Sequence, residues 1–396
     1  MKKVLSALLL AVLIIPVLLA AAPKAAAETV TINVYNWGQY ISDGTDGAID
    51  VNKAFTEATG IHVNYMTYDS NETLYTKLKT GGSTYDVIIP SDYMIGRLIS
   101  EGLLEKLDYS NIPNYQYIEE AYKNTAYDPT NEYSVPYTWG TVGVIYNKKY
   151  VDEADIGSWD LLWNEKYKGK ILMFSNPRDA FAIAESRLGY SLNTQNEEEI
   201  RACAELLLEQ KPLVQAYVMD QIYNAMEHEE AWVAPYYAGD YLQMLEVNED
   251  LGFYFPEEGF NFFIDAACIP TSCTNKEAAE AYINFLCDPE IMAENLDYLG
   301  YSVPSEAAKE YMDEEAIANP VAYPDAETLA RGEAFLSLDQ QTNQLMDKLW
   351  LTVKTSGGAN YLLYGGIAVV VIAVVLIVIL VSRKKRLARR RSGYTR

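Results

Sequence analysis

Short apolar segments that end in a turn and continue directly into a helix-like segment recur along this chain, and this pattern restricts the fold more than any other feature. Three examples are "YDVIIPSDYMIGRLISEGLLEKLD" (85–108), "GKILMFSNPRDAFAIAESRLGYSLNT" (169–194) and "EAWVAPYYAGDYLQMLE" (230–246). Strands that alternate with helices predict a mainly parallel sheet covered by helices. We therefore expect an α/β protein.

One helix in this series has clear start and stop signals. In "DSNETLYTKLKTGG" (69–82), Asp69 and Glu72 fit a capping box, and Gly81 and Gly82 follow the last helical turn. Such residues favour the two ends of a helix. The segment predicts a short helix directly after a strand.

Large aromatic, hydroxyl and acidic residues gather where the predicted strands end. The segment "VTINVYNWGQYISDG" (30–44) reads as a half-buried strand followed by aromatic residues and a turn. Open α/β sheets bind ligands at the carboxyl ends of their strands, which favours a binding wall, although any single aromatic residue could instead close the end of a core. The residues in question are Trp37, Tyr40, Ser91, Tyr93, Asp179, Tyr237, Phe263, Asp265 and Tyr301.

Asp265 is the residue of this set that is hardest to explain by structure alone. It lies inside the apolar run "GFNFFIDAACIPTS" (259–272), two residues after Phe263 and hence on the same face of a strand. A carboxylate in such a run is costly to bury unless it meets a cation or hydrogen-bond donors. Asp179 has a simpler alternative role, because it opens a predicted helix and can complement the helix dipole.

The two ends of the chain predict targeting segments rather than parts of the fold. Residues 1–27 have the basic start, apolar run and small-residue cleavage pattern of an export signal. Residues 361–381 are uncharged and long enough to span a bilayer, and residues 382–396 carry a basic cluster that the positive-inside rule places in the cytoplasm. We expect an exported domain held at the cell membrane by one C-terminal transmembrane helix.

The exported part is strongly acidic. Three of the 31 basic residues precede residue 28 and eight follow Val381, which leaves 20 basic against 55 acidic residues, a formal charge of −35 for residues 28–360. Such a surface repels nucleic acid and attracts cations, although it also serves general solubility. No nucleic-acid partner is expected.

The scarcity of histidine and the spacing of cysteine argue against metal sites and common catalytic groups. His62 and His228 are the only histidines, and four cysteines show neither paired metal spacing nor a disulfide framework, although Cys268 and Cys273 could form a bridge. We expect no cofactor, no metal and no catalytic residue.

About 330 exported residues are too many for one small core, so two lobes are expected.

The mixture of aromatic rings and carboxylates at the strand ends suits an elongated organic cation. Rings pack on methylene groups and face ammonium groups, while carboxylates neutralise the charge. No cluster of arginine or lysine and no glycine-rich phosphate loop accompanies these residues.

The chain also resembles the spermidine/putrescine-binding proteins, which are the extracellular receptors of polyamine ABC transporters. The segments that carry the resemblance come in family order and span roughly residues 31–333. They are "YNWGQYI", "YDSNETLYTKLKTG", "YDVIIPSDYMI", "EYSVPYTWGTVGVIYN", "SWDLLWNEKYKGKI", "RLGYSLNT", "AYINFLCDPEIM" and "YPDAETLARGE".

The resemblance implies the type II periplasmic-binding-protein fold, with two α/β lobes, a ligand cleft and crossing hinge strands. Residues 28–356 would form the binding domain, with hinges near residues 137–141 and 261–266. Lobe 1 would comprise about 28–138 and 265–312, and lobe 2 about 139–264 and 313–356.

The resemblance also implies the ligand-binding positions. The ligand would contact Trp37, Tyr40, Ser91, Tyr93, Asn176, Asp179, Tyr237, Phe263, Asp265 and Tyr301. Asn176 stands where the family usually has an acid, and Tyr237 and Phe263 replace aromatic residues that are often tryptophan.

The implied function is the capture of spermidine, putrescine or both, and their delivery to the permease subunits of an importer that a cytoplasmic ATPase drives. Two other functions are compatible with single features. Tyr236 and Tyr237 are adjacent, as in ferric-ion receptors of the same fold, and Asp179 and Asp265 could act as the acid and base of an anchored carbohydrate-active enzyme.

Overall fold

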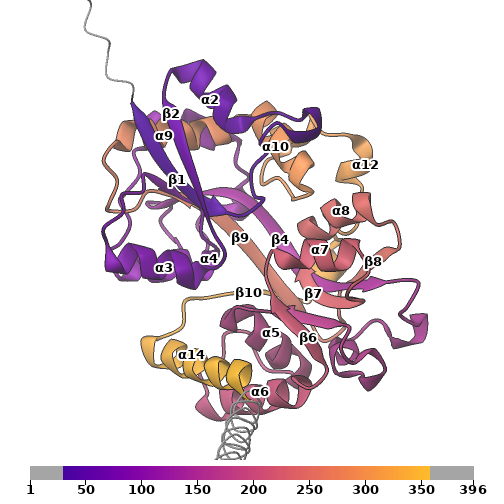
Figure 1. The fold of residues 1–396 in the computed structure, drawn as a ribbon. Helices are drawn as coiled ribbons and strands as arrows, with labels where there is room; N and C mark the ends of the chain where they lie inside the picture. Colours follow the sequence, from indigo (N-terminus) through magenta and orange to yellow (C-terminus); the bar gives the residue numbers. More distant parts are fainter. Residues whose placement is uncertain (1–29, 357–396) are drawn as a thin grey trace, which may run out of the picture. The chain divides into compact units, whose positions relative to one another are not determined.

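The computed structural model describes residues 30–356, which fold as two compact units. Among these residues, unit 1 comprises 30–139 and 264–319, and unit 2 comprises 140–263 and 320–356. The chain passes from one unit to the other inside two long strands, β4 (Ser134–Asn147) and β9 (Phe260–Cys268), and once more after residue 319 (Figure 1).

The sheet of unit 1 is parallel at its centre and antiparallel at one side. Strand β1 (Thr31–Trp37) lies between β2 (His62–Tyr68) and β3 (Val87–Ile88) and pairs with both in parallel. Strand β3 then pairs with β9 in the antiparallel sense. The parallel strands expected from the sequence are therefore present, and the carboxyl ends of β1 and β3 lie at one edge of the sheet.

Helices connect these strands, and local capping residues set their ends. Ser70 accepts a hydrogen bond from the backbone N–H of Thr73 and thereby begins the helix α3, so the cap lies one residue later than the predicted Asp69. The helices of unit 1 are α2 (Val51–Thr59), α3 (Asn71–Thr80), α4 (Asp92–Ser100), α9 (Lys276–Leu286), α10 (Pro289–Leu299), α11 (Glu306–Lys309) and α12 (Glu314–Ile317). Its 3₁₀ turns are Thr45–Gly47, Tyr109–Asn111, Pro113–Tyr117 and Glu120–Tyr122.

Unit 2 has a sheet of similar construction. Strand β5 (Ile171–Phe174) pairs in parallel with β6 (Val214–Val218) and β7 (Val233–Tyr237). Strand β4 pairs in the antiparallel sense with β7 and with β8 (Leu251–Tyr254), while the short β10 (Gly332–Ala334) pairs with the start of β9.

The helices of unit 2 connect and cover this sheet. They are α5 (Pro177–Leu188), α6 (Glu197–Gln210), α7 (Gln221–Glu227), α8 (Ala238–Val247), α13 (Ala326–Leu329) and α14 (Gln340–Thr355). Its 3₁₀ turns are Glu153–Asp155, Trp159–Trp163 and Glu165–Tyr167. Asn176 caps the first turn of α5 by accepting a hydrogen bond from the backbone N–H of Asp179, and Gly189 ends the helix in the left-handed conformation that glycine adopts without strain.

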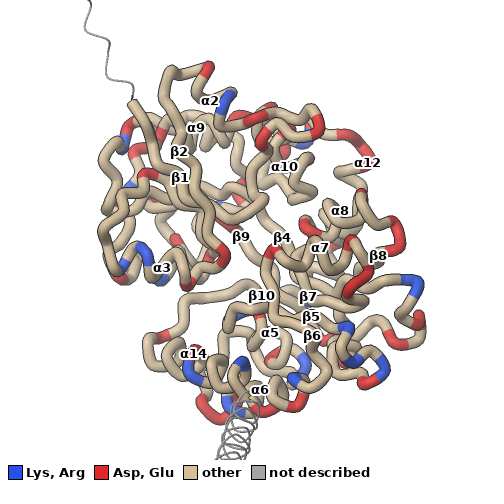
Figure 2. The backbone as a smooth tube through the Cα atoms, in the orientation of Figure 1, with Lys and Arg blue, Asp and Glu red and all other residues tan. Residues whose placement is uncertain are grey.

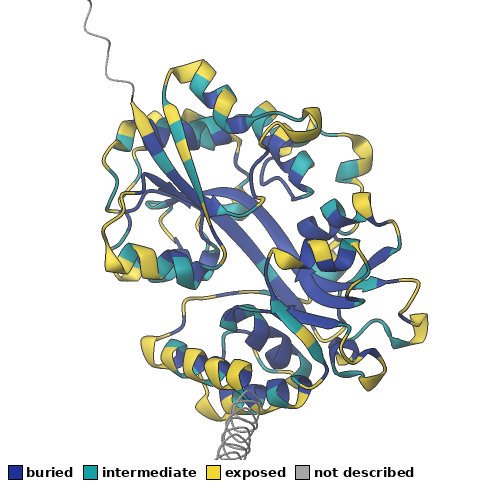
Figure 3. Ribbon diagram, viewed as in Figure 1, coloured by how far each residue is buried: buried dark blue, intermediate teal, exposed yellow. Residues whose placement is uncertain are grey.

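The central strands form the buried core of each unit, whereas β2 and β6 at the sheet edges are partly exposed and the helices expose one face. All residues of β5 are buried, and β4 is buried along nearly its whole length. Figure 3 shows the exposed faces of α3 and α14 in yellow. Asp and Glu positions lie on helices and loops of both units (Figure 2), so the acidic charge expected from the composition is spread over the surface.

The expectation of a C-terminal transmembrane helix is corrected. No helix within residues 30–356 is long and apolar enough to span a bilayer. The longest, α14, has 16 residues and buries only one face, whereas a bilayer requires roughly 20 consecutive apolar residues. The segment predicted to cross the membrane, 361–381, lies outside the described residues, as do the predicted export signal (1–27) and the basic tail (382–396).

The bridge considered between Cys268 and Cys273 does not form. All four cysteines are free thiols, and Cys203, Cys268 and Cys287 are buried. Burial raises the pKa of the Cys273 thiol to about 12, which disfavours its thiolate form.

Candidate functional site

Eight of the ten residues expected to bind a ligand form two clusters, one in each unit. Four of them, Tyr40, Ser91, Asp265 and Tyr301, contact one another in unit 1 and are called the Asp265 cluster below. Four others, Asn176, Asp179, Tyr237 and Phe263, meet in unit 2 and are called the Asp179 cluster. The remaining two, Trp37 and Tyr93, are held beside the strand ends of unit 1 by other partners.

Asp265 is the centre of the cluster in unit 1. Its side chain is only 4% exposed, and its Oδ2 accepts a 2.8 Å hydrogen bond from the hydroxyl of Tyr40. Ser91 lies directly opposite Asp265 as an isolated antiparallel β-bridge. The Tyr40 ring in turn packs edge-on against Tyr301, with ring centroids 5.0 Å apart. Asp265 therefore lies among the aromatic and hydroxyl groups that the sequence predicted to accompany it.

Trp37 is positioned by Tyr68, the last residue of β2, and by Ile89, which follows β3. Its indole N–H donates to the carbonyl of Ile89 at 2.9 Å, and the Tyr68 hydroxyl donates to the same carbonyl at 2.7 Å. The rings of Trp37 and Tyr68 lie 4.7 Å apart. Tyr68 was not predicted as a site residue, although its place at the end of β2 is the same signal that identified Trp37.

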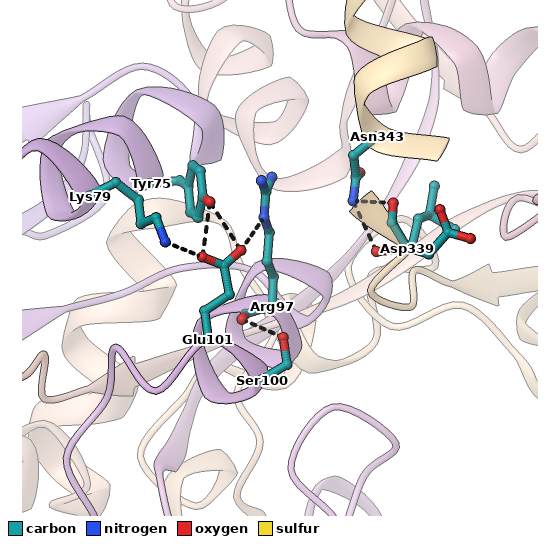
Figure 4. A network of polar contacts seen from close by, with 8 residues as sticks. Tyr75, Lys79, Arg97, Ser100, Glu101, Asp339 and Asn343 are labelled. Carbon is teal, nitrogen blue, oxygen red and sulfur yellow. Dashed lines mark hydrogen bonds and ion pairs between the residues drawn. The ribbon is translucent and has the colours of Figure 1, made fainter. Parts of the chain in front are cut away.

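Tyr93 and Ser91 at the start of α4 are held by residues of α3. The Tyr93 hydroxyl donates to Glu72 Oε1 at 2.9 Å, and the Asn71 amide donates to Ser91 Oγ at 3.1 Å. A second set of contacts links the other ends of the same two helices (Figure 4). There Glu101 accepts hydrogen bonds from Tyr75 and Lys79 of α3. These contacts fix α3 and α4 against each other at both ends.

The Asp179 cluster combines a carboxylate with three neutral groups. Asp179 Oδ2 accepts hydrogen bonds from the Asn176 amide at 2.6 Å and from the Tyr237 hydroxyl at 2.8 Å. Tyr237 packs edge-on against Phe263, with ring centroids 5.5 Å apart. Burial raises the pKa of Asp179, and the hydrogen bonds from Tyr237 and Asn176 only partly oppose this shift. A bound cation would stabilise the charged form of such a carboxylate.

Arg178 adjoins Asp179 in sequence but makes contacts with other segments. Its Nη2 donates to Asn193 Oδ1 at 2.8 Å and to the carbonyl of Leu336 at 3.3 Å, and its guanidinium lies over the ring of Phe335. The helix α14 begins a few residues later, where Asp339 caps it and accepts a hydrogen bond from the Asn343 amide (Figure 4). Arg178 thus connects the start of α5 to the segment before α14.

The adjacent tyrosines that suggested a ferric-ion site lie in different environments. Tyr236 is 2% exposed and its ring stacks on Phe174, so burial holds the pKa of its phenol well above the usual range. Only Tyr237 joins the Asp179 cluster. Within residues 30–356 no group of three or more His, Cys, Asp or Glu side chains is arranged to hold a metal ion.

Two α/β units, each with carboxylates and aromatic rings at its strand ends, define a receptor for a small solute. The family model for bacterial extracellular solute-binding proteins matches residues 51–325. This chain therefore belongs to the bacterial extracellular solute-binding protein family. Members of this family are solute receptors, so the chain is a binding protein and not an enzyme.

Individual relatives agree with this assignment. The chain is 35% identical over 309 residues to the spermidine/putrescine-binding periplasmic protein of Salmonella typhimurium, an alignment that covers 78% of this chain and 87% of the relative. It is 33% identical over 348 residues to a putrescine-binding periplasmic protein of Pseudomonas aeruginosa, which covers 83% and 93%. The solved structure of a spermidine/putrescine ABC transporter substrate-binding protein from Streptococcus pneumoniae matches with a TM-score of 0.69 and 38% identity, and covers 82% and 99%.

Proposed function

We propose that this protein captures a polyamine, spermidine or putrescine, outside the cytoplasm and delivers it to the permease of an ABC importer. The observation that carries the proposal is the chemistry of the two clusters. Each presents a carboxylate that is hydrogen-bonded by neutral hydroxyl or amide groups and accompanied by aromatic rings. Polyamines carry separated ammonium groups on a flexible chain of methylene groups. Carboxylates are suited to bind the ammonium groups, and aromatic rings are suited to pack on the methylene groups.

The proposed contacts follow from the two clusters. Asp265 in unit 1 and Asp179 in unit 2 are each suited to accept hydrogen bonds from an ammonium group. In unit 1, Trp37, Tyr40 and Tyr301 would supply rings for methylene groups, with Ser91 and Tyr93 as polar contacts. In unit 2, Tyr237 and Phe263 would supply the rings and Asn176 the polar contact. The curated relatives named for spermidine and putrescine support this ligand class.

The two other functions compatible with single sequence features have less support. A ferric-ion site would require Tyr236 and Tyr237 to bind together, but Tyr236 is buried in a ring stack. A carbohydrate-active enzyme would belong to another family. The polyamine receptor remains the function that the clusters and the family support best.

Isothermal titration calorimetry of the purified protein tests the proposal. Spermidine or putrescine should bind with an affinity that declines as the salt concentration rises, because salt screens the attraction between ammonium and carboxylate groups. 1,4-Butanediol, a neutral diol of the same length as putrescine, is the matched control ligand and should not bind measurably. Equal affinity for the diol and the diamine would refute the proposal.

A further inference from the structure

The turn that carries Tyr40 is held by residues that lie outside the predicted site. It follows β1, and Gln39 within it adopts a left-handed backbone conformation with φ of 47°. Such a conformation is strained for a non-glycine residue and persists where the surroundings fix it. Gln39 itself is exposed, so neighbouring residues must supply the contacts that hold the turn.

Two side chains donate to the same backbone carbonyl in this turn. The hydroxyl of Tyr137 donates to the carbonyl of Tyr40 at 2.8 Å, and the amide of Asn36 donates to it at 3.2 Å. Tyr137 is 3% exposed and its ring lies 5.6 Å from that of Tyr40. Tyr137 therefore contacts both the backbone and the side chain of Tyr40.

Asn295 determines the direction of the Tyr137 hydrogen bond. Its Oδ1 accepts a 2.9 Å hydrogen bond from the backbone N–H of Ser42, which can only donate, so the orientation of the amide is fixed. Its Nδ2 then faces the Tyr137 hydroxyl and donates to it at 2.7 Å. A phenol has a single proton, and because its oxygen accepts from Asn295, that proton is directed to the carbonyl of Tyr40.

Asn295 belongs to the helix α10, and it is 1% exposed. The same helix ends just before Tyr301, whose backbone N–H donates to the carbonyl of Leu296 at 3.0 Å. Tyr301 packs against the Tyr40 ring. The helix α10 thus carries the amide that contacts Ser42 and Tyr137, and its C-terminal end leads directly to Tyr301, a ring of the Asp265 cluster.

We propose that Asn295 is a positioning residue of the polyamine site: through Ser42 and Tyr137 it fixes the turn that carries Tyr40, and so it sets the geometry of the hydrogen bond between Tyr40 and Asp265. This inference rests on the proposed function. Asn295 touches no ligand in this scheme, and its effect on affinity passes through Tyr40.

The first test compares two buried asparagines, each of which donates one side-chain hydrogen bond and accepts another. Asn295→Leu removes both hydrogen bonds and should weaken the binding of spermidine or putrescine by about five- to ten-fold, the size expected for one misplaced hydrogen bond. Asn248→Leu is the matched control in unit 2. Asn248 is 7% exposed, donates to the carbonyl of Met226 and accepts from the N–H of Asp250. The Asn248→Leu variant should have a lower melting temperature than the parent, while its affinity for spermidine or putrescine stays within about two-fold of the parent's.

The second test asks whether the effect passes through Tyr137. Tyr137→Phe removes only the hydroxyl, and it should reproduce the loss of affinity with little change in packing. The double variant, with both Asn295→Leu and Tyr137→Phe, should bind polyamine no more weakly than whichever single variant binds more weakly. The reason is that both changes break the same connection between Asn295 and Tyr40. Losses that multiply instead, or an Asn295→Leu protein that binds like the parent, would overturn the inference. If Asn295→Leu does not fold, Tyr137→Phe tests the same connection at its other end, and an unchanged affinity in that variant would overturn the inference.

Amide hydrogen exchange of the unliganded protein separates this inference from the proposed function. Residues 38–42 should exchange faster in Asn295→Leu and Tyr137→Phe than in the parent, and they should be unchanged in Asn248→Leu. Unchanged exchange in Asn295→Leu would show that Asn295 does not hold the turn, whatever the ligand is. If the parent binds neither spermidine nor putrescine, the proposed function fails, and the exchange result still decides the role of Asn295.

Discussion

The hydroxyl of Tyr40 donates a 2.8 Å hydrogen bond to the carboxylate of Asp265, a residue 225 positions further along the chain. Both side chains are almost fully buried. Because a phenol is neutral, the bond orients the carboxylate without cancelling its negative charge. The arrangement suits a site in which a ligand supplies the positive charge.

Asp265→Asn should cause the largest loss of polyamine affinity of any single change in the site. Removing one partner of a buried, hydrogen-bonded charge pair costs roughly 2–5 kcal/mol, which corresponds to about thirty-fold to several-thousand-fold in the dissociation constant. Calorimetric titration with spermidine and putrescine measures the loss. The melting temperature should stay close to that of the parent, because the unliganded protein loses a buried charge.

Asp86→Asn is the control for a buried aspartate of unit 1 with a structural role. Burial favours the neutral form of Asp86, but backbone N–H groups of Asn33, Thr274 and Asn275 outweigh this effect and hold its pKa below the usual range. Its replacement should reduce the free energy of unfolding by roughly 1–3 kcal/mol and leave affinity nearly unchanged. If Asp86→Asn lost affinity and Asp265→Asn lost only stability, the site would have been assigned to the wrong carboxylate.

Polyamine binding should release protons in mildly acidic solution. Burial raises the pKa of Asp179 in the unliganded protein, and a bound ammonium group lowers it again. Affinity should therefore decrease as the pH falls through the pKa of the unliganded form. Calorimetry in two buffers with different enthalpies of ionisation measures the released protons. Asp179→Asn should abolish the buffer dependence, and a parent protein without such dependence would contradict this assignment.

Gly140→Ala should weaken binding by displacing an aromatic ring of the Asp179 cluster. A Cβ atom at Gly140 would lie 2.6 Å from Cζ of Phe263, closer than real Cβ contacts allow, so the ring must move away from its place beside Tyr237. We expect a loss of affinity of several-fold, measured by the same titration.

Gly143→Ala, three residues further along β4, is the comparison variant for a glycine whose substitution meets the backbone as well as a side chain. Its Cβ atom would lie 2.7 Å from the backbone carbonyl of Tyr254, which cannot rotate aside as a side chain can. This change should reduce the free energy of unfolding by roughly 1–3 kcal/mol, more than Gly140→Ala does. A greater loss of stability in Gly140→Ala would show that Phe263 cannot move independently of the fold.

Glu185→Gln should stabilise the protein in neutral and alkaline solution. Glu185 is fully buried in α5, neither carboxylate oxygen has a hydrogen-bond partner within the described residues, and burial raises its pKa from 4.5 to about 8. The charge of Arg178 opposes this shift, and those of Glu333 and Glu199 add to it.

The sign of the pH dependence follows from the raised pKa. Between roughly pH 4.5 and 8 the folded protein holds a proton that the unfolded chain has released, so stability falls as the pH rises, by up to about 1.4 kcal/mol per pH unit. Urea unfolding of parent and Glu185→Gln across this range isolates the contribution. Parallel stability profiles would show that Glu185 ionises normally.

The order of strands and helices could be read from the sequence because it depends on neighbouring residues. Apolar runs gave the strands, and turns and glycines marked their ends. The helix predicted after β2 is present as α3, and Gly81 ends it as expected. The choice of Ser70 over Asp69 as its cap was missed, because both residue types accept the same hydrogen bond and only the backbone path selects one.

Candidate site residues could be proposed from the sequence because aromatic and acidic residues at strand ends are conspicuous, and their role in binding stays a prediction. Asp265 stands out because a carboxylate in an apolar run is costly to bury. The contacts of Asn36 and Asn295 with the candidate site could not be predicted, because a polar residue in an ordinary strand or helix gives no local signal of its partners. Their importance lies in partners that are distant in sequence.

What the tertiary structure decided is which of these residues meet. Tyr40 and Asp265 come together because β3, which lies beside β1, also pairs with β9, and Tyr137 and Asn295 meet across 158 positions. Local patterns reach only a few residues along the chain, since they reflect the periods of strands and helices. Strand pairing joins distant segments through backbone groups that every residue shares, so it leaves no comparable mark on the sequence.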